Sequence, residues 1–81
     1  MKTTVDLLRI GDKATITYVD LDKIPLKLLE MGCLPDNDLE VIQIAPFGDP
    51  IYLNINNGSH LAIRKETAHE IEVELHEKPS K

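Results

Sequence analysis

The second half of the sequence alternates apolar and polar residues, and this pattern restricts the possible folds more than any other feature. Apolar side chains occupy every second position in 51–55, 61–63 and 71–75. Such alternation is typical of strands with one buried face. The segment Asn56-Asn57-Gly58 lies between the first two strands and contains an Asn-Gly pair, which favours a tight hairpin turn.

The first half of the sequence predicts two more strands. Residues 14–19 are rich in β-branched and aromatic residues, and alternation places Ile16 and Tyr18 on one face. Leu39 and Val41 begin another strand, but Val41-Ile42 breaks its alternation. A change of phase within a strand indicates a bulge or a sharp bend, which a small barrel needs where it curls.

One short helix is predicted at about 22–31, directly after the first strand. Asp22 is placed to cap it, Pro25 falls in its first turn, and Gly32 stands where a left-handed C-cap is needed. Leu26 and Leu29 are expected off the main apolar stripe. That stripe follows helical spacing through Leu21, Ile24, Leu28 and Met31. We therefore expect a mainly β fold, a small SH3-like barrel of about five strands with one inserted helix. The domain should span 1–76, followed by a disordered tail at 77–81.

Composition argues against several classes of function. The chain has 81 residues with 14 acidic and 9 basic side chains and 4% aromatic residues, a poor composition for binding nucleic acid. No apolar run reaches the roughly 18 to 20 residues of a membrane span, and residues 1–9 do not resemble a signal peptide. We expect a cytoplasmic protein without direct membrane insertion.

The sequence offers little for catalysis or metal binding. His60, His69 and His76 lack the spacing that brings two imidazoles onto one ion, so no metal site is predicted. Glutamates at 70, 72 and 74 are typical of a solvated strand face and allow at most weak ferrous-ion binding. Cys33 follows the end of the helix, where a buried structural role is expected. No nucleophile elbow or phosphate-binding glycine loop is present, so we expect no enzyme and no cofactor.

The loop 45–50 is the most unusual local feature. Pro46 and Pro50 restrict its conformations, and Phe47 is the only phenylalanine of the chain. Phe47 either folds back as a lid over one end of the barrel or projects as an apolar contact for a partner. We favour the second alternative, because prolines can hold an exposed ring in place at small entropic cost.

Three blocks of sequence together resemble the FeoA family, small cytosolic accessory proteins of bacterial ferrous-iron uptake. They are Leu28-Leu29-Glu30-Met31-Gly32 followed by Leu34-Pro35, then Ala45-Pro46-Phe47-Gly48-Asp49-Pro50, then residues 61–68 leading into Ile71-Glu72-Val73. The resemblance implies an SH3-like domain like the C-terminal domain of iron-dependent repressors. It also implies a non-enzymatic regulatory adaptor that binds the cytosolic part of the FeoB-type membrane transporter, which carries a GTPase domain.

The resemblance also implies which residues matter for structure or docking. These are Leu29, Met31, Pro46, Phe47 and Arg64, together with Lys27, where the family usually has arginine. Lysine keeps the charge but loses the bidentate geometry of arginine.

Two other functions stay open at this point. One is a transition-metal-binding domain that senses or carries iron, which needs three or more convergent ligands. The other is a detached repressor-type domain, which predicts a basic face or an attached DNA-binding helix. Weak homo-oligomerisation also stays open.

Overall fold

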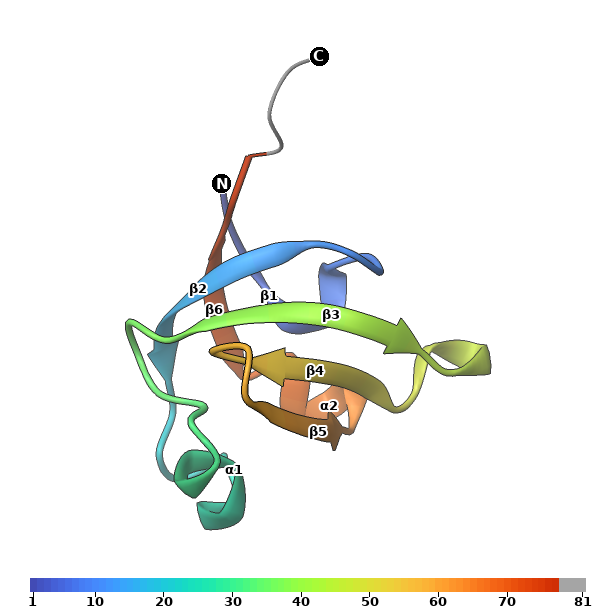
Figure 1. The fold of residues 1–81 in the computed structure, drawn as a ribbon. Coiled ribbons are helices and arrows are strands. Elements are labelled where there is room, and N and C mark those ends of the chain that lie inside the picture. Colours follow the sequence, from blue (N-terminus) through green and yellow to red (C-terminus); the bar gives the residue numbers. More distant parts are fainter. Residues whose placement is uncertain (78–81) are drawn as a thin grey trace.

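The computed structural model describes residues 1–77 (Figure 1). Its elements are β1 (Lys2–Thr4), η1 (Val5–Leu7), β2 (Lys13–Val19), α1 (Leu26–Glu30), β3 (Asp38–Ile44), η2 (Pro46–Gly48), β4 (Ile51–Ile55), β5 (Ser59–Ile63), α2 (Lys65–Ala68) and β6 (Ile71–Leu75). Within these residues six strands pair antiparallel in one sheet, in the order β1-β6-β2-β3-β4-β5. The prediction of a mainly β fold with an SH3-like arrangement is confirmed. Of the expected tail, residues 78–81 lie outside the described part.

The sixth strand is β1, which the sequence did not predict. Its residues Lys2, Thr3 and Thr4 carry no apolar alternation, so no pattern signals a strand. Pairing with β6 holds these residues in an extended conformation instead. In addition, the N–H of Leu75 donates to the carbonyl of Met1 at 2.9 Å. The tertiary context creates this strand, as is common for short edge segments.

Two register shifts bend the sheet, and one of them was predicted. The pairing of β3 with β4 shifts between Val41 and Gln43, which confirms the expected bulge. The pairing of β2 with β6 shifts between Ile16 and Tyr18. The expectation that Ile16 and Tyr18 share a face was therefore wrong, because the irregularity reverses the alternation. Ile16 is fully buried, whereas the Tyr18 residue is 53% exposed.

Helix α1 is shorter than the predicted 22–31, and Asp22 does not cap it. The N-cap residue is Pro25, whose ψ of 139° is extended and which makes no side-chain cap bond. A separate turn precedes the helix, in which the N–H of Asp22 donates to Oδ1 of Asp20 at 3.0 Å. Because the helix starts only at Leu26, Leu21 lies outside it.

The helix packs on the sheet through a face that differs from the predicted stripe. Leu28, Leu29 and Met31 are half-buried against the core. Leu29 therefore belongs to the packed face of the helix, although the sequence placed it off the apolar stripe. Leu21 is 65% exposed and Leu26 is 69% exposed. Only Leu26 therefore presents an unburied leucine on α1 itself.

The hairpin between β4 and β5 turns at Asn56 and Asn57, one residue earlier than the Asn-Gly pair suggested. Both asparagines are left-handed, with φ values of 51° and 58°. The N–H of Gly58 donates to the carbonyl of Ile55 at 3.0 Å and closes the turn. Asparagine tolerates this backbone better than most residues, so the position of the hairpin was predicted correctly and only its centre differs.

The core lies between the curved strands, where the apolar faces meet. The predicted inward positions at 51, 53, 55, 61, 63, 71 and 73 are all buried, as are Val5, Leu8, Ala14, Ile16, Val19, Ile24, Cys33, Leu39, Val41 and Ala68. No polar or charged residue of the described part is buried with them. Outward-facing positions of the strands carry the polar side chains, as a half-exposed sheet requires.

Candidate partner-docking surface

The loop that connects β3 and β4 is held closed by backbone hydrogen bonds. The N–H of Ala45 donates to the carbonyl of Pro50 at 3.0 Å, and the N–H of Gly48 donates to the carbonyl of Ala45 at 2.9 Å. Oδ1 of Asp49 accepts from the N–H of Lys65 at 2.9 Å, which ties the loop to the start of α2. The loop is therefore fixed at three points and projects from one end of the sheet (Figure 1).

Phe47 stands on this loop with its side chain in solvent. The residue is 103% exposed, so it does not form a lid over the barrel. Its φ of 72° lies in the left-handed region, which a bulky side chain rarely adopts. Asparagine or glycine would satisfy the backbone at lower cost. Neither burial nor backbone preference therefore accounts for a phenylalanine at this position.

The three predicted residues on α1 and at its C-cap divide into two groups. Lys27 is exposed, whereas Leu29 and Met31 are half-buried against the core. Leu29 and Met31 therefore attach the helix to the core of the domain. Lys27 and the exposed Leu26 face solvent, where a partner can reach them.

The six predicted residues lie in two separate regions of the molecule. Arg64 directly precedes Lys65, whose N–H binds Asp49, so Arg64 lies near the loop of Pro46 and Phe47. In Figure 1, α1 extends from the opposite end of the sheet. The structure thus places Arg64 beside the residue that binds the loop of Pro46 and Phe47, and it leaves Lys27, Leu29 and Met31 apart from them.

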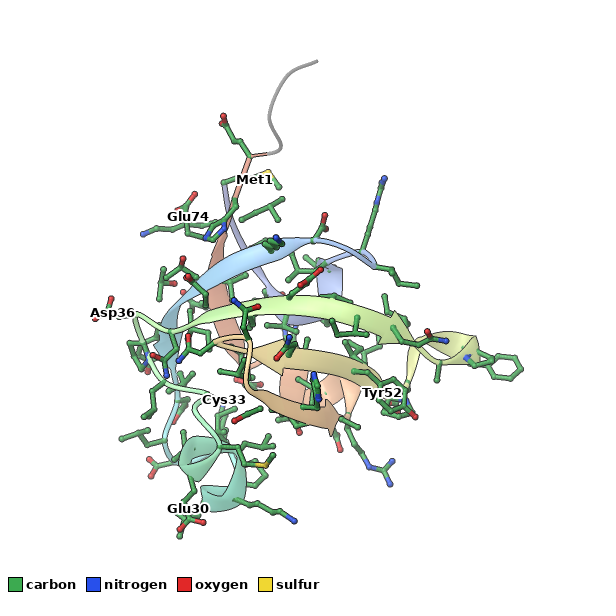
Figure 2. The ribbon with its side chains drawn as sticks, in the orientation of Figure 1. Met1, Glu30, Cys33, Asp36, Tyr52 and Glu74 are labelled. Carbon is green, nitrogen blue, oxygen red and sulfur yellow. The ribbon has the colours of Figure 1, made fainter. Side chains whose placement is uncertain are left out.

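The end of α1 is built around a buried thiol. The N–H of Cys33 donates to the carbonyl of Leu28 at 3.0 Å, and that of Gly32 donates to the carbonyl of Leu29 at 3.1 Å. With Gly32 at a φ of 106°, these bonds form a Schellman motif, which confirms the predicted C-cap. Cys33 is fully buried between α1 and the sheet (Figure 2). Burial raises the pKa of its thiol to about 11, so the side chain is a neutral core residue.

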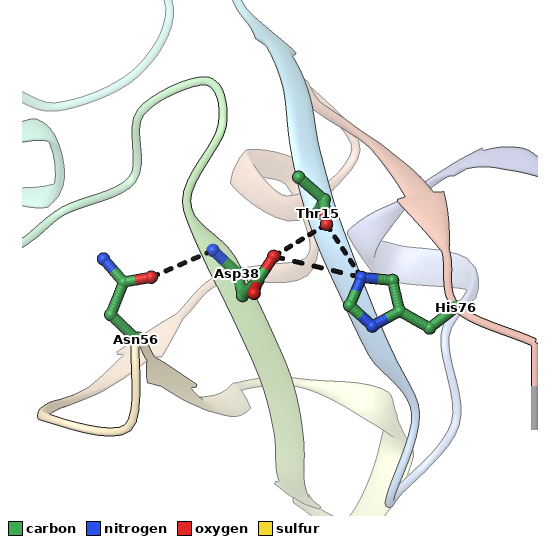
Figure 3. A network of polar contacts seen from close by, with 4 residues as sticks. All are labelled: Thr15, Asp38, Asn56 and His76. Carbon is green, nitrogen blue, oxygen red and sulfur yellow. Dashed lines mark hydrogen bonds and ion pairs between the residues drawn. The ribbon is translucent and has the colours of Figure 1, made fainter.

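A polar network joins three strands and the hairpin (Figure 3). The hydroxyl of Thr15 donates to Oδ1 of Asp38 at 2.7 Å and lies 2.7 Å from Nε2 of His76. Oδ1 of Asn56 accepts from the N–H of Asp38 at 3.0 Å. His76 and Asp38 are 3.9 Å apart, an ion pair when the imidazole is protonated. The network links β2, β3 and the end of β6 to the hairpin turn.

Among residues 1–77, no group of three or more histidine, cysteine, aspartate or glutamate side chains is arranged to hold a metal ion. His69 lies 3.3 Å from Asp6 and His76 contacts Thr15, so these two histidines take part in separate contacts.

An apolar groove on β3, β4 and β5 was not predicted. It has a volume of about 630 Å³ and is lined by Ile42, Gln43, Tyr52, Leu53, His60, Leu61 and Ala62. Ile42 is 43% exposed because it follows the buried Val41, and Tyr52 is 41% exposed. The sequence signal that points to this face is the near absence of acidic residues from 41 to 65, where only Asp49 occurs.

No helix in residues 1–77 is both long and apolar enough to cross a membrane.

Comparison with known proteins gives consistent results for sequence and fold. One relative, from Porphyromonas gingivalis, is a fusion of Fe(2+) transport protein A with the Fe(2+) transporter FeoB, and it is 39% identical over 69 residues. That alignment covers 84% of this chain but only 8% of the fusion protein. The NMR structure of a FeoA-like protein from Clostridium acetobutylicum is 26% identical, with a TM-score of 0.83 over 99% of this chain and 93% of that one.

A second class of structures shares the fold. A manganese-dependent transcriptional repressor matches with a TM-score of 0.78 at 22% identity, over 93% of this chain and 37% of the repressor. This similarity confirms the expected relation to a domain of metal-dependent repressors at the level of the fold. The FeoA domain model matches residues 3–75, nearly the whole chain. The chain therefore belongs to the FeoA domain family.

Proposed function

We propose that this protein is a non-enzymatic regulatory adaptor of ferrous-iron uptake that binds the cytosolic part of a FeoB-type membrane transporter. The fused relative supports a functional association, because there one polypeptide joins a FeoA domain to FeoB. Fusion places the two parts at high local concentration, which favours even a weak contact between them. A separate chain must form that contact through its own surface.

The observation that carries the proposal is Phe47. Its ring is fully exposed on a loop that is fixed by hydrogen bonds. Its φ of 72° lies in the left-handed region, which is unfavourable for a bulky residue. An exposed aromatic side chain on a strained, ordered backbone adds no folding stability, and such strain tends to occur at functional sites. Aromatic side chains on rigid supports are frequent energetic centres of protein interfaces.

The surface around Phe47 gives the contact its chemistry. Pro46 and Phe47 present apolar area, and Arg64 adds a cation that can bind a carboxylate of the transporter. Lys27 on α1 is a second, separate cationic contact. Leu29 and Met31 act indirectly, since they hold α1 on the barrel.

The alternative of an iron-carrying domain needs a ligand set that residues 1–77 do not supply. The two functions are separated by a capture experiment in iron-starved cells. The tagged chain and its Phe47→Asn variant are purified from solubilised membranes, and the FeoB-type transporter is detected with a specific antibody. The adaptor function predicts capture by the wild-type chain and loss of capture by the variant. Absence of the transporter from the wild-type sample would contradict it.

A further inference from the structure

Strand β5 forms one border of the sheet and is open for pairing. Among residues 1–77 it pairs only with β4, through a register that runs from Ile55 and Ser59 to Ile51 and Ile63. In Figure 1 it lies at the lower border of the sheet. Because β5 has one strand neighbour, alternate residues direct their N–H and C=O groups away from β4. These groups form a template for another strand.

The border at β5 lacks the features that usually protect an exposed strand. Ser59–Ile63 contains no proline, no lysine and no register shift against β4. Proteins commonly block such edges with prolines, lysines, bulges or very short strands. The opposite border is protected in this way, since β1 has only three residues and carries Lys2. The five residues of β5 therefore lack the protective sequence features that β1 carries.

The groove beside β5 can accept an apolar side chain. Tyr52 and Ala62 are cross-strand partners, and both are exposed on the outer face of the hairpin (Figure 2, where Tyr52 is labelled). Ile42 adds an exposed apolar side chain from β3. A strand added to β5 places every second side chain on this same face, because side chains alternate along a strand.

Charge selects the kind of strand that fits. Asp49 is the only acidic residue between Val41 and Lys65, although the chain carries 14 acidic residues. His60 lies in the groove, and Arg64 and Lys65 follow the end of β5. In a chain of net charge -5, residues 50–65 form the longest stretch of sequence without a carboxylate. A partner segment that carries carboxylates meets little repulsion here and two cations at one end.

We propose that the free edge of β5 binds an extended, acidic segment of a partner protein, which adds to the sheet as a further antiparallel or parallel strand. Backbone hydrogen bonds to β5 supply affinity, and one apolar side chain of the segment packs on Ala62 at the near side of the groove. Carboxylates of the segment contact Arg64 and Lys65. This site shares Arg64 with the surface around Phe47, but its backbone contacts lie on β5 and do not depend on the identity of the transporter.

The test uses two capped peptides, Glu-Val-Glu-Leu-Glu-Val and its counterpart with lysine at the three glutamate positions. Each is titrated into the ¹⁵N-labelled full chain, and amide shifts and hydrogen exchange are followed by NMR. We expect the acidic peptide to shift and protect the amides of 59–63, and the lysine peptide to bind at least about tenfold more weakly. Raising the salt concentration from about 0.05 to about 0.3 M should weaken only the acidic peptide.

Matched variants place the site on β5. Ala62→Glu introduces a carboxylate on the exposed face and should weaken the acidic peptide by about tenfold or more, whereas Ala62→Gln should retain binding. Thr17→Glu is the control, since Thr17 is exposed on β2, which β3 and β4 separate from β5. It should leave binding unchanged.

Several results would overturn the proposal. These are equal affinity for both peptides, unchanged affinity of Ala62→Glu, or shifts confined to α1 or the Phe47 loop. If the free chain sediments as a dimer that Ala62→Glu dissociates, the edge belongs to a second copy and the acidic-segment proposal is wrong. None of these results bears on capture of the transporter through Phe47, so the two proposals fail independently.

Discussion

Gly32 at the end of α1 lies directly against Ile55 at the end of β4. A Cβ atom at Gly32 would stand 3.1 Å from Cγ2 of Ile55, closer than an ordinary contact. The carbonyl of Gly32 also accepts a 2.8 Å hydrogen bond from Nδ2 of Asn37. Glycine therefore serves two purposes here: it permits the left-handed C-cap of α1, and it lets that C-cap approach the sheet.

Gly32→Val should destabilise the domain by at least about 2 kcal/mol. The left-handed φ of 106° strains any β-branched residue, and the added side chain overlaps Ile55. Gly11→Val is the matched control, because Gly11 has a φ of 91° but no atom within 4 Å of an added Cβ. It should cost about 1 kcal/mol from strain alone. Equal losses in urea unfolding would show that contact with Ile55 contributes nothing.

The buried thiol of Cys33 should make stability fall at high pH. Burial raises its pKa from 9.0 to about 11, so above pH 9 the unfolded chain loses this proton before the folded one does. Below pH 9 the neutral, buried thiol makes its full contribution to the free energy of unfolding. This contribution decreases by about 2 kcal/mol as the pH rises toward 11. The free energy of unfolding of Cys33→Ala, measured over the same range, should lack this part of the decrease. Parallel pH profiles for the two proteins would refute the assignment.

Asn56 should stabilise the hairpin in two separable ways. Its φ of 51° favours asparagine or glycine, and its Oδ1 accepts from the N–H of Asp38. Asn56→Ala loses both effects and should cost about 1 to 2 kcal/mol, whereas Asn56→Gly loses only the hydrogen bond and should cost less. Thermal unfolding of the two variants measures the difference. If the glycine variant is as unstable as the alanine variant, the left-handed backbone of Asn56 contributes nothing to stability.

Ferrous ion should bind this chain only weakly and without a defined stoichiometry. Residues 1–77 contain no cluster of three ligands, and His69 and His76 contact Asp6 and Thr15 respectively. Anaerobic calorimetry with ferrous ion measures this directly, and we expect no site tighter than about 1 μM. One tighter site of unit stoichiometry would favour the iron-carrying function over the adaptor.

Strands with one buried face were predictable because alternation records burial directly. The inward positions of 51–55, 61–63 and 71–73 were recovered, Leu75 is only partly buried, and the Val41-Ile42 break located the bulge in β3. The bulge near Tyr18 was missed, since polar Thr17 between Ile16 and Tyr18 preserves a normal alternation. The irregularity there is visible only in the pairing with β6.

Other features depend on contacts that local sequence does not record. Strand β1 has no apolar pattern and forms only because β6 offers an edge. The start of α1 was predicted too early, because Pro25 takes an extended conformation and Asp22 belongs to a separate turn. From the sequence, Phe47 could either cover one end of the domain as a lid or project as a contact for a partner. The structure excludes the lid, because the ring is fully exposed. The roles of Lys27, Leu29, Met31, Pro46, Phe47 and Arg64 in docking stay predictions.

The most direct test of the adaptor function is calorimetric titration of the purified chain into the cytosolic GTPase domain of a FeoB-type transporter from the same cell. We expect saturable binding that Phe47→Asn weakens by about tenfold or more, since an exposed aromatic contact is lost. The melting temperature of the variant should be unchanged or higher, because asparagine suits the φ of 72°. Tyr18→Asn, which removes another exposed ring from β2, should bind as the wild type does. No binding by the wild-type chain, or full binding by a stable Phe47→Asn variant, would contradict the account.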